Sequence, residues 1–185
     1  MRTGLRWAVA FGAAILIGAS DAPPEPAGYR MDDYRSAVPA TLQGAAVLST
    51  DAARDHWERR DAVFIDVLPQ APRPTRLPAS TIWREKSRED VPGSVWLPDT
   101  GYGALAPVME RYFEYGLEQA TGGMRDRMLV FYCLANCWMS WNAAKRAVAI
   151  GYTRVAWYPD GTDGWSAEHL PLEPRTPLPR PHAAE

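Results

Sequence analysis

The sequence has few cysteines, few histidines and no basic tract, and each shortage excludes a class of protein. It contains 2 cysteines and 3 histidines in 185 residues, with a formal net charge of −2. Two cysteines are too few for the disulfide framework of a small secreted domain. A structural zinc site needs four ligands, and so few cysteines and histidines argue against such a site here. Without a cluster of lysine and arginine, nucleic acid is not an expected partner.

A long hydrophobic run is also missing, apart from a short one at the N-terminus. Residues 7–19 are uncharged, follow Arg2 and Arg6, and precede small residues. This run is shorter than the roughly 20 apolar residues of a membrane span. The pattern predicts a signal peptide over residues 1–22 and a periplasmic or secreted protein with no membrane association after cleavage. An uncleaved anchor helix is the alternative.

The rest of the chain alternates between strand and helix patterns. We expect a proline-rich N-terminal arm over residues 23–44, one domain over residues 45–172, and a proline-rich tail over residues 173–185. Apolar stretches predict strands at 62–67, 94–99, 127–133 and 154–161, and helix patterns cover 49–61, 105–123 and 140–151. Residues 68–90 form a loop insertion. This order predicts an α/β domain with a largely parallel sheet flanked by helices.

Both cysteines lie in the segment FYCLANCWMS, between a predicted strand and a predicted helix. Cys133 ends the strand and Cys137 follows four residues later. Ligands and chemistry gather at the carboxyl ends of parallel strands, where loop N–H groups and a helix N-terminus stabilise a thiolate. We therefore interpret Cys133 as the reactive thiol and Cys137 as the resolving thiol. A buried, inert Cys133 is the competing interpretation.

The residues around the two thiols would support such a site. We assign the supporting loop to Leu134, Ala135, Asn136, Trp138, Met139 and Ser140, with Ser140 as a helix cap. Trp138 would shield the thiols, stack on a partner, or pack in the core. Asp66, at the end of an earlier strand, would give structural support by accepting a loop or helix N–H. A disulfide across so small a loop would add little stability and would serve better as a redox switch.

Several signatures in order resemble a rhodanese-like domain. They are AVFIDV at 62–67, VPGSVWLP at 91–98, and MLVFYC followed by AAKRAVAIGYTRVAWYPDGTDGW within 128–165. The resemblance covers about residues 45–170, and implies that Cys133 would carry a persulfide. Family loops often contain glycine and a cation, and this loop contains neither. Cations of the insertion could supply charge, but we expect them in a solvated loop: Arg73, Arg76, Arg84, Lys86 and Arg88.

A narrower resemblance concerns CWMSWNAAKRA together with the predicted signal peptide. It is similar to the exported rhodanese-like proteins associated with PQQ-dependent catabolism and named for a Cys-x-x-Cys-Trp motif. Here three residues, not two, separate Cys133 from Cys137. This resemblance implies a periplasmic partner, either a quinoprotein dehydrogenase or a cytochrome c. An association with PQQ rests on it alone, and the residues themselves predict no cofactor.

The leading hypothesis is thiol–disulfide or persulfide (sulfur transfer) chemistry, accessory to PQQ-dependent alcohol oxidation. One alternative is a non-catalytic binding module that recognises PQQ, cytochrome c or a quinoprotein dehydrogenase through a tryptophan-rich cleft. A second alternative is a Cu(I)-binding chaperone, with the two thiolates and His169 as soft and borderline ligands. Haem attachment would need Cys-x-x-Cys-His, which the sequence lacks.

Overall fold

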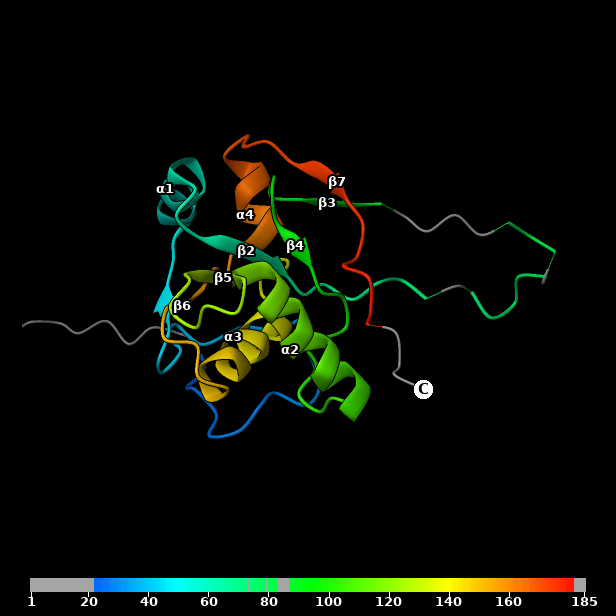
Figure 1. Ribbon diagram of the computed structural model, residues 1–185, viewed down its shortest axis with the longest axis horizontal. Coiled ribbons are helices and arrows are strands. Elements are labelled where there is room, and N and C mark those ends of the chain that lie inside the picture. Colours follow the sequence, from blue (N-terminus) through cyan, green and yellow to red (C-terminus); the bar gives the residue numbers. More distant parts are fainter. Residues whose placement is uncertain (1–21, 73, 79, 83–86, 182–185) are drawn as a thin grey trace, which may run out of the picture.

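The structure is a computed structural model that describes residues 22–72, 74–78, 80–82 and 87–181. A single parallel sheet runs through the molecule with helices on both faces (Figure 1). The predicted signal peptide lies outside the described residues, apart from Ala22. Within the described part of the chain, no helix combines the length and hydropathy that crossing a membrane requires.

The central sheet has five strands in the order β1-β6-β5-β2-β4, and each neighbouring pair is parallel. The strands are β1 (Ala46–Val47), β2 (Val63–Asp66), β4 (Val95–Trp96), β5 (Leu129–Tyr132) and β6 (Val155–Trp157). Strand β5 lies at the centre and is buried along its whole length. The parallel pairing confirms the predicted α/β fold class with a largely parallel sheet. The burial of β5 agrees with its sequence, because an apolar run without alternation is typical of a strand covered on both faces.

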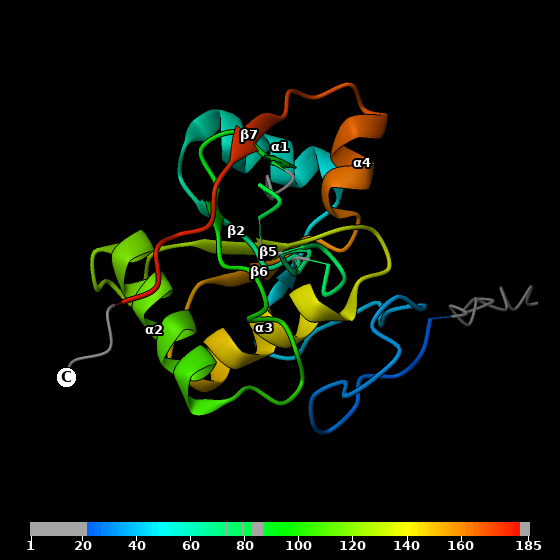
Figure 2. The same ribbon diagram turned by 90° about the vertical axis from the view of Figure 1, so that its right-hand side faces the viewer.

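Helices cover the sheet in two pairs. Helices α2 (Pro107–Thr121) and α3 (Trp138–Ala149) lie on one face, and α1 (Thr50–Arg59) and α4 (Gly161–Ala167) lie on the other (Figures 1 and 2). The core accordingly divides into two clusters, in which successive residues of β5 alternate. Phe131 and Cys133 belong to the α2/α3 cluster, whereas Val130 and Tyr132 belong to the α1/α4 cluster.

Helix ends follow the sequence signals at two helices and depart from them at a third. Ser49 caps α1 by accepting a hydrogen bond from the Ala52 N–H at 3.3 Å. Gly122 ends α2 in the left-handed conformation that glycine tolerates best. Helix α3 begins at Trp138 with Cys137 as its N-cap residue. Ser140 is therefore not the cap that the sequence suggested, and lies buried in the first turn.

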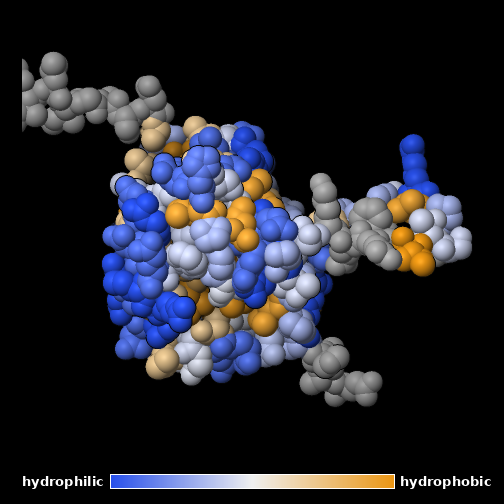
Figure 3. All heavy atoms as spheres, turned by 90° about the horizontal axis from the view of Figure 1, so that it is seen from above, coloured by the Kyte–Doolittle hydropathy of each residue, from blue (hydrophilic) through white to orange (hydrophobic). Residues whose placement is uncertain are grey.

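Four elements form in segments without a predicted strand or helix, and one of them is β1 at the edge of the central sheet. Strands β3 (Arg88–Asp90) and β7 (Glu173–Arg175) pair in an antiparallel two-stranded sheet, within the predicted insertion and the predicted tail. Helix α4 begins where the predicted strand at 154–161 ends. The short strands stabilise each other across a long sequence separation, so local patterns do not reveal them. The described parts of residues 68–87 extend away from the body, and the face over α1 and α4 is mostly hydrophilic (Figures 1 and 3).

Candidate active site

The two cysteines are joined in a disulfide at the carboxyl end of β5. Their Cα atoms lie 6.5 Å apart, within the usual range for a disulfide. Cys133 follows the last residue of β5, and Cys137 precedes the first residue of α3. Their exposed fractions are 0% and 1%. The structure therefore places the pair at the edge of the sheet that the sequence predicts, but the sulfur atoms are buried and not open to solvent.

The loop between the cysteines turns outward and back within three residues. Leu134 and Ala135 are half-buried, and Asn136 is exposed at the tip with a φ of 52°. Asparagine is one of the few residues that adopt this left-handed conformation readily. The Ala135 N–H donates to Asp163 Oδ2 of α4 at 3.0 Å, so α4 anchors the loop.

Ser140 ties the start of α3 to the sheet. Its Oγ donates to the Cys137 carbonyl at 3.0 Å and accepts from Trp157 Nε1 of β6 at 3.0 Å. Both Ser140 and Trp157 are fully buried, so the hydroxyl satisfies two groups that water cannot reach. Ser140 thus supports the disulfide loop from inside the α2/α3 core, and Met139 lies in the same apolar cluster.

The N-terminal arm covers the same end of α3. The Trp138 N–H donates to the Tyr34 carbonyl at 2.9 Å, and the indole Nε1 lies within hydrogen-bond reach of Ser36 Oγ (3.1 Å) and the Ala37 carbonyl (3.0 Å). The Arg30 guanidinium lies 5.3 Å from the centre of the Trp138 ring. The arm therefore supplies a hydrogen-bond acceptor to one of the backbone N–H groups at the helix N-terminus, which have no partner within the helix.

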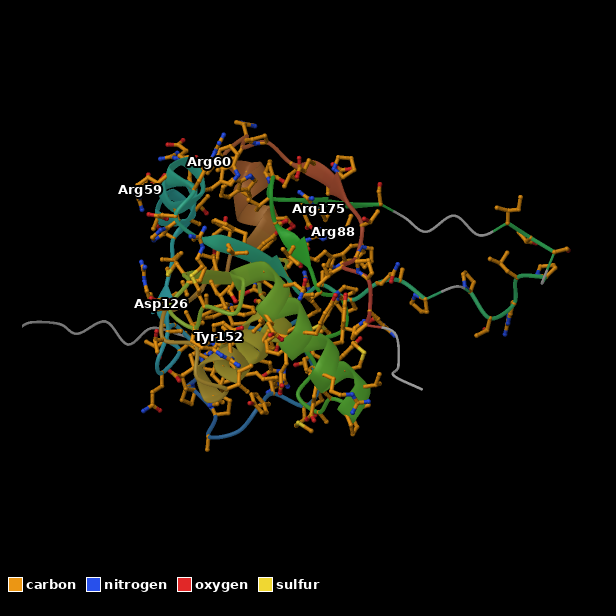
Figure 4. All side chains as sticks on the ribbon, viewed as in Figure 1. Arg59, Arg60, Arg88, Asp126, Tyr152 and Arg175 are labelled. Atoms are coloured by element: carbon orange, nitrogen blue, oxygen red, sulfur yellow. A yellow bond between two sulfur atoms is a disulfide. The ribbon has the colours of Figure 1, made fainter. Side chains whose placement is uncertain are left out.

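Asp66 and Arg88 meet on the opposite face of the sheet. Asp66 Oδ1 accepts from the Leu68 N–H at 2.7 Å, which is the kind of loop contact proposed for this aspartate. Its Oδ2 accepts from Arg88 Nε at 2.6 Å. The Arg88 side chain is only 13% exposed. The expectation of a solvated insertion is therefore wrong for this cation, because pairing with β7 draws β3 back against the sheet and buries the guanidinium beside a carboxylate (Figure 4).

Arg88 and Thr162 hold the backbone of Cys133. The Cys133 carbonyl accepts from the Thr162 N–H at 3.0 Å and from Thr162 Oγ1 at 3.3 Å. Arg88 Nη2 lies 3.1 Å from Thr162 Oγ1 and 3.5 Å from the carbonyl itself. Only a glycine fits at position 161, because a Cβ there would clash with the same carbonyl, and its φ is +53°. The buried cation therefore reaches the disulfide loop through the carbonyl of its first cysteine.

Sequence reasoning missed most of this second group. Neither Thr162 nor Asp163 was a predicted site residue, and Arg88 was one of five cations in a long insertion. A signal that could have found Arg88 is its spacing within Arg-x-Asp, which places two opposite charges on one face of a short strand. Nothing local to the sequence shows that this face meets Asp66.

Most of the described tryptophans pack in the core. Among the described tryptophans, Trp96, Trp138, Trp141, Trp157 and Trp165 are buried. Each of their indole N–H groups, and that of Trp57, donates to an oxygen of the protein. Burial with a satisfied polar group is the usual state of tryptophan. Because the Trp138 ring is buried in this conformation, a partner cannot stack on it without a rearrangement.

Metal-binding side chains do not gather near the disulfide. Within the described residues, no group of three or more His, Cys, Asp or Glu side chains is placed to hold a metal ion. His169 is exposed and adopts a φ of 55° just beyond α4. The two sulfurs bond to each other in this structure, and a disulfide does not offer the thiolates that Cu(I) prefers.

No protein-family model matches the sequence, and a search of curated proteins finds no match either. Solved structures do show similarity. One is an uncharacterized protein from Saccharomyces cerevisiae, at 20% identity and a TM-score of 0.41, covering 67% of this chain and 92% of the other. A second is the polysulfide-sulfur transferase homodimer of Wolinella succinogenes, at 19% identity and 0.44, covering 77% and 84%. A third is thiosulfate sulfurtransferase of Pseudomonas aeruginosa, at 16% identity and 0.49, covering 72% and 21%.

Proposed function

We propose that this chain is an exported protein that uses Cys133 and Cys137 for thiol–disulfide or persulfide chemistry. The observation that carries the proposal is the disulfide between these residues at the carboxyl end of the central strand. Parallel sheets concentrate chemistry at this edge. Because the loop between the cysteines is short, the bond contributes limited stability through chain entropy, and a purely structural role would gain little from it.

In the exchange reaction, the reduced pair would act on a disulfide of a partner. The Cys133 thiolate attacks one sulfur of the partner, the partner's S–S bond breaks, and the released partner thiolate takes up a proton. The Cys137 thiolate then attacks the Cys133 sulfur of the mixed disulfide. This step forms the Cys133–Cys137 bond and releases the second partner thiol, so two electrons pass from the pair to the partner.

The same two residues can complete a sulfur transfer. The Cys133 thiolate would first attack the outer sulfur of a persulfide or polysulfide donor. The donor's S–S bond breaks, the shortened donor leaves as a thiolate, and Cys133 becomes a persulfide. Attack of the Cys137 thiolate on the Cys133 sulfur atom bound to Cβ then forms the disulfide and releases hydrosulfide. Both routes therefore end in the bonded pair that the structure contains.

The proposed cellular location and partner rest on the sequence alone. We propose export because residues 1–22 have the pattern of a signal peptide. The resemblance to exported rhodanese-like proteins of PQQ-dependent catabolism supports a quinoprotein dehydrogenase or a cytochrome c as the partner. The mature charge is not strongly basic, so a protein surface with exposed thiols or disulfides fits better than nucleic acid.

Access to the sulfurs requires a movement. Cys133 and Cys137 are buried, and the arm contacts Trp138 next to them. A partner thiol must approach a disulfide sulfur directly, so the tip of the loop or the arm has to move before exchange. We propose that this cover opens transiently, which admits small thiols and disulfides, and that docking of the partner favours the open state.

The experiment is a trapping reaction on the full mature chain. Reduced Cys137→Ser is mixed with oxidised glutathione and analysed by intact mass, beside Cys133→Ser as the matched control. We expect a stable glutathione adduct on Cys137→Ser and little on Cys133→Ser, because only Cys133 is the attacking thiol. Equal adducts on both variants would contradict the assignment of roles, and no adduct on either would contradict exchange.

A second arm separates sulfur transfer from exchange. Reduced Cys137→Ser is treated with inorganic polysulfide, and wild-type protein is treated in parallel. Sulfur transfer predicts a mass increase of one sulfur on the variant, and disulfide with released hydrosulfide from the wild type. If neither protein gains sulfur but the glutathione adduct forms, the chain is an exchange protein only. A protein that reacts in neither arm would support a binding role.

A further inference from the structure

Behind the carbonyl of Cys133 lies a second, fully buried carboxylate that the proposed chemistry has not used. Asp90 of β3 has an exposed fraction of 0%, as does Asp66 of β2. Arg88 Nε lies between them, 2.6 Å from Asp66 Oδ2 and 3.2 Å from Asp90 Oδ1. Two carboxyl groups therefore share one guanidinium in a space that water does not reach.

The shared guanidinium, the complete burial and the missing hydrogen-bond partners of Asp90 favour one proton held between the two carboxyl groups. Among the described groups, neither Asp90 oxygen accepts a hydrogen bond of good geometry. A buried carboxylate left in that state is costly, whereas a protonated Asp90 can donate to Asp66 beside it. Burial, followed by the contact with Asp66, raises the pKa of Asp90 to about 9. With one proton between the two carboxyl groups, a single negative charge faces the Arg88 guanidinium.

The other charged and titratable groups facing Asp90 come from two further strands. Arg175 of β7 pairs across from Arg88 and lowers the pKa of Asp90, but less than burial raises it (Figure 4). Glu173 of β7 interacts with Arg175 and so offsets part of its charge. Tyr132 of β5 is fully buried, and burial raises its pKa well above the usual value, so it stays neutral.

The route from this group to the thiol passes through Arg88. One of its amino nitrogens contacts Thr162 Oγ1 and the Cys133 carbonyl, while its Nε faces the two carboxyl groups. The net charge around Arg88 therefore contributes to the electrostatic potential at the Cys133 loop. When Asp90 loses its proton, a second negative charge appears behind the residue that must itself become an anion.

We propose that Asp90 is a positioning residue for the thiol chemistry, which by sharing a proton with Asp66 leaves the Arg88 charge available to the Cys133 loop. This inference rests on the proposed function, in which the Cys133 thiolate is the attacking group. Above the pH at which Asp90 ionises, its carboxylate partly neutralises the positive charge of the Arg88 guanidinium. The Cys133 thiolate is then less stable, and its formation is opposed.

The test compares Cys137→Ser with Cys137→Ser/Asp90→Asn, in which Cys133 is the single thiol. The amide of asparagine keeps the neutral, hydrogen-bonding form of Asp90 at every pH. The alkylation rate with iodoacetamide is followed by intact mass from pH 5 to pH 10. We expect equal rates at pH 6, and at pH 9 about threefold faster alkylation of the asparagine variant, which corresponds to about half a pH unit in the ionisation of the thiol.

Equal rates at both pH values would overturn the inference. A constant ratio across the range would also overturn it, because a merely structural change does not follow the ionisation of Asp90. Asp66→Asn in the same background is the second variant, and should remove the same pH dependence if Asp90→Asn fails to fold. Alkylation measures the ionisation of Cys133 whether or not the protein exchanges with glutathione disulfide, so failure of the proposed function is recognised separately.

Discussion

The two faces of the sheet treat Cys133 in opposite ways. On the α2/α3 face its side chain enters an apolar cluster and bonds to Cys137, which precedes the Trp138 that the N-terminal arm contacts. On the α1/α4 face its carbonyl meets Thr162 and the buried guanidinium of Arg88. Apolar contacts surround the sulfur on one face, and on the other face Thr162 and Arg88 donate to the backbone carbonyl.

The difference shows how one residue can be both protected and polarised. An apolar cover alone would disfavour a thiolate, because burial destabilises the charged form of an acid. A charged group on the same side as the sulfur would need water or a partner ion around it. Placing Arg88 behind the backbone lets its field reach the loop while the sulfur stays dry. The following predictions test each face in turn.

The largest effect is expected from breaking the charged face. Arg88→Met leaves Asp66 and Asp90 buried without their cation, and removing one partner of a buried pair costs about 3–5 kcal/mol. The free energy of unfolding, measured in urea, should fall by this amount, since protonation of Asp90 relieves only part of the repulsion. Arg88→Lys keeps the charge and should recover part of the loss. A loss below about 1 kcal/mol in Arg88→Met would show that the ion pairs do not stabilise this face.

The pH dependence of stability should come next in size. The pKa of Asp90 in the folded protein is raised to about 9, above the value near 3.9 expected in the unfolded chain. Its contribution is therefore fully present below about pH 4 and is progressively lost as the pH rises toward 9. Urea midpoints of wild type and Asp90→Asn, compared from pH 5 to pH 9, should diverge in the variant's favour as the pH rises. Parallel curves would contradict a protonated Asp90.

On the sulfur face, Ser140→Ala should give a smaller loss. It leaves the Trp157 indole N–H buried without its acceptor, which costs about 1–3 kcal/mol of unfolding free energy. Ser166→Ala, at an exposed position of α4, is the control and should change stability by less than about 0.5 kcal/mol. If both variants unfold at the same urea concentration, Ser140 does not support the loop.

The smallest effect concerns the cover over the disulfide. Trp138→Phe keeps the ring but removes the N–H that lies within reach of Ser36 and Ala37. Weakening the arm by about 1 kcal/mol should speed reduction of the disulfide by dithiothreitol about fivefold. Trp165→Phe loses a comparable hydrogen bond, to Pro171 on the other face, and should leave the reduction rate unchanged. Equal acceleration in both variants would mean that general destabilisation, not the arm, controls access.

Local patterns predicted the central sheet and the placement of the cysteines. The apolar run at 127–133 indicated a buried central strand, and β5 occupies its middle. Ser49 and Gly122 marked a helix start and a helix end. These features depend on neighbours in sequence, so one sequence is enough to find them.

The charged face could not be predicted in the same way. Arg88 meets Asp66 only because β3 pairs with β7, which lies beyond α4 in the chain. Asp90 looked like an ordinary charge of a solvated loop, and burial changed its chemistry. The cover over Cys137 was hidden for the same reason, since the arm residues that contact Trp138 lie about a hundred positions earlier.

That separation between the arm and α3 also bears on the order of folding. Ser36 contacts Trp138 across 102 positions and Pro26 contacts Lys145 across 119, so the arm closes some of the longest loops in the chain. Contacts of such span tend to form late, after the local turns of α3. We therefore expect the two thiols to meet an oxidant while the arm is still undocked. In pulse-alkylation during refolding, loss of free thiols should then precede the burial of Trp138.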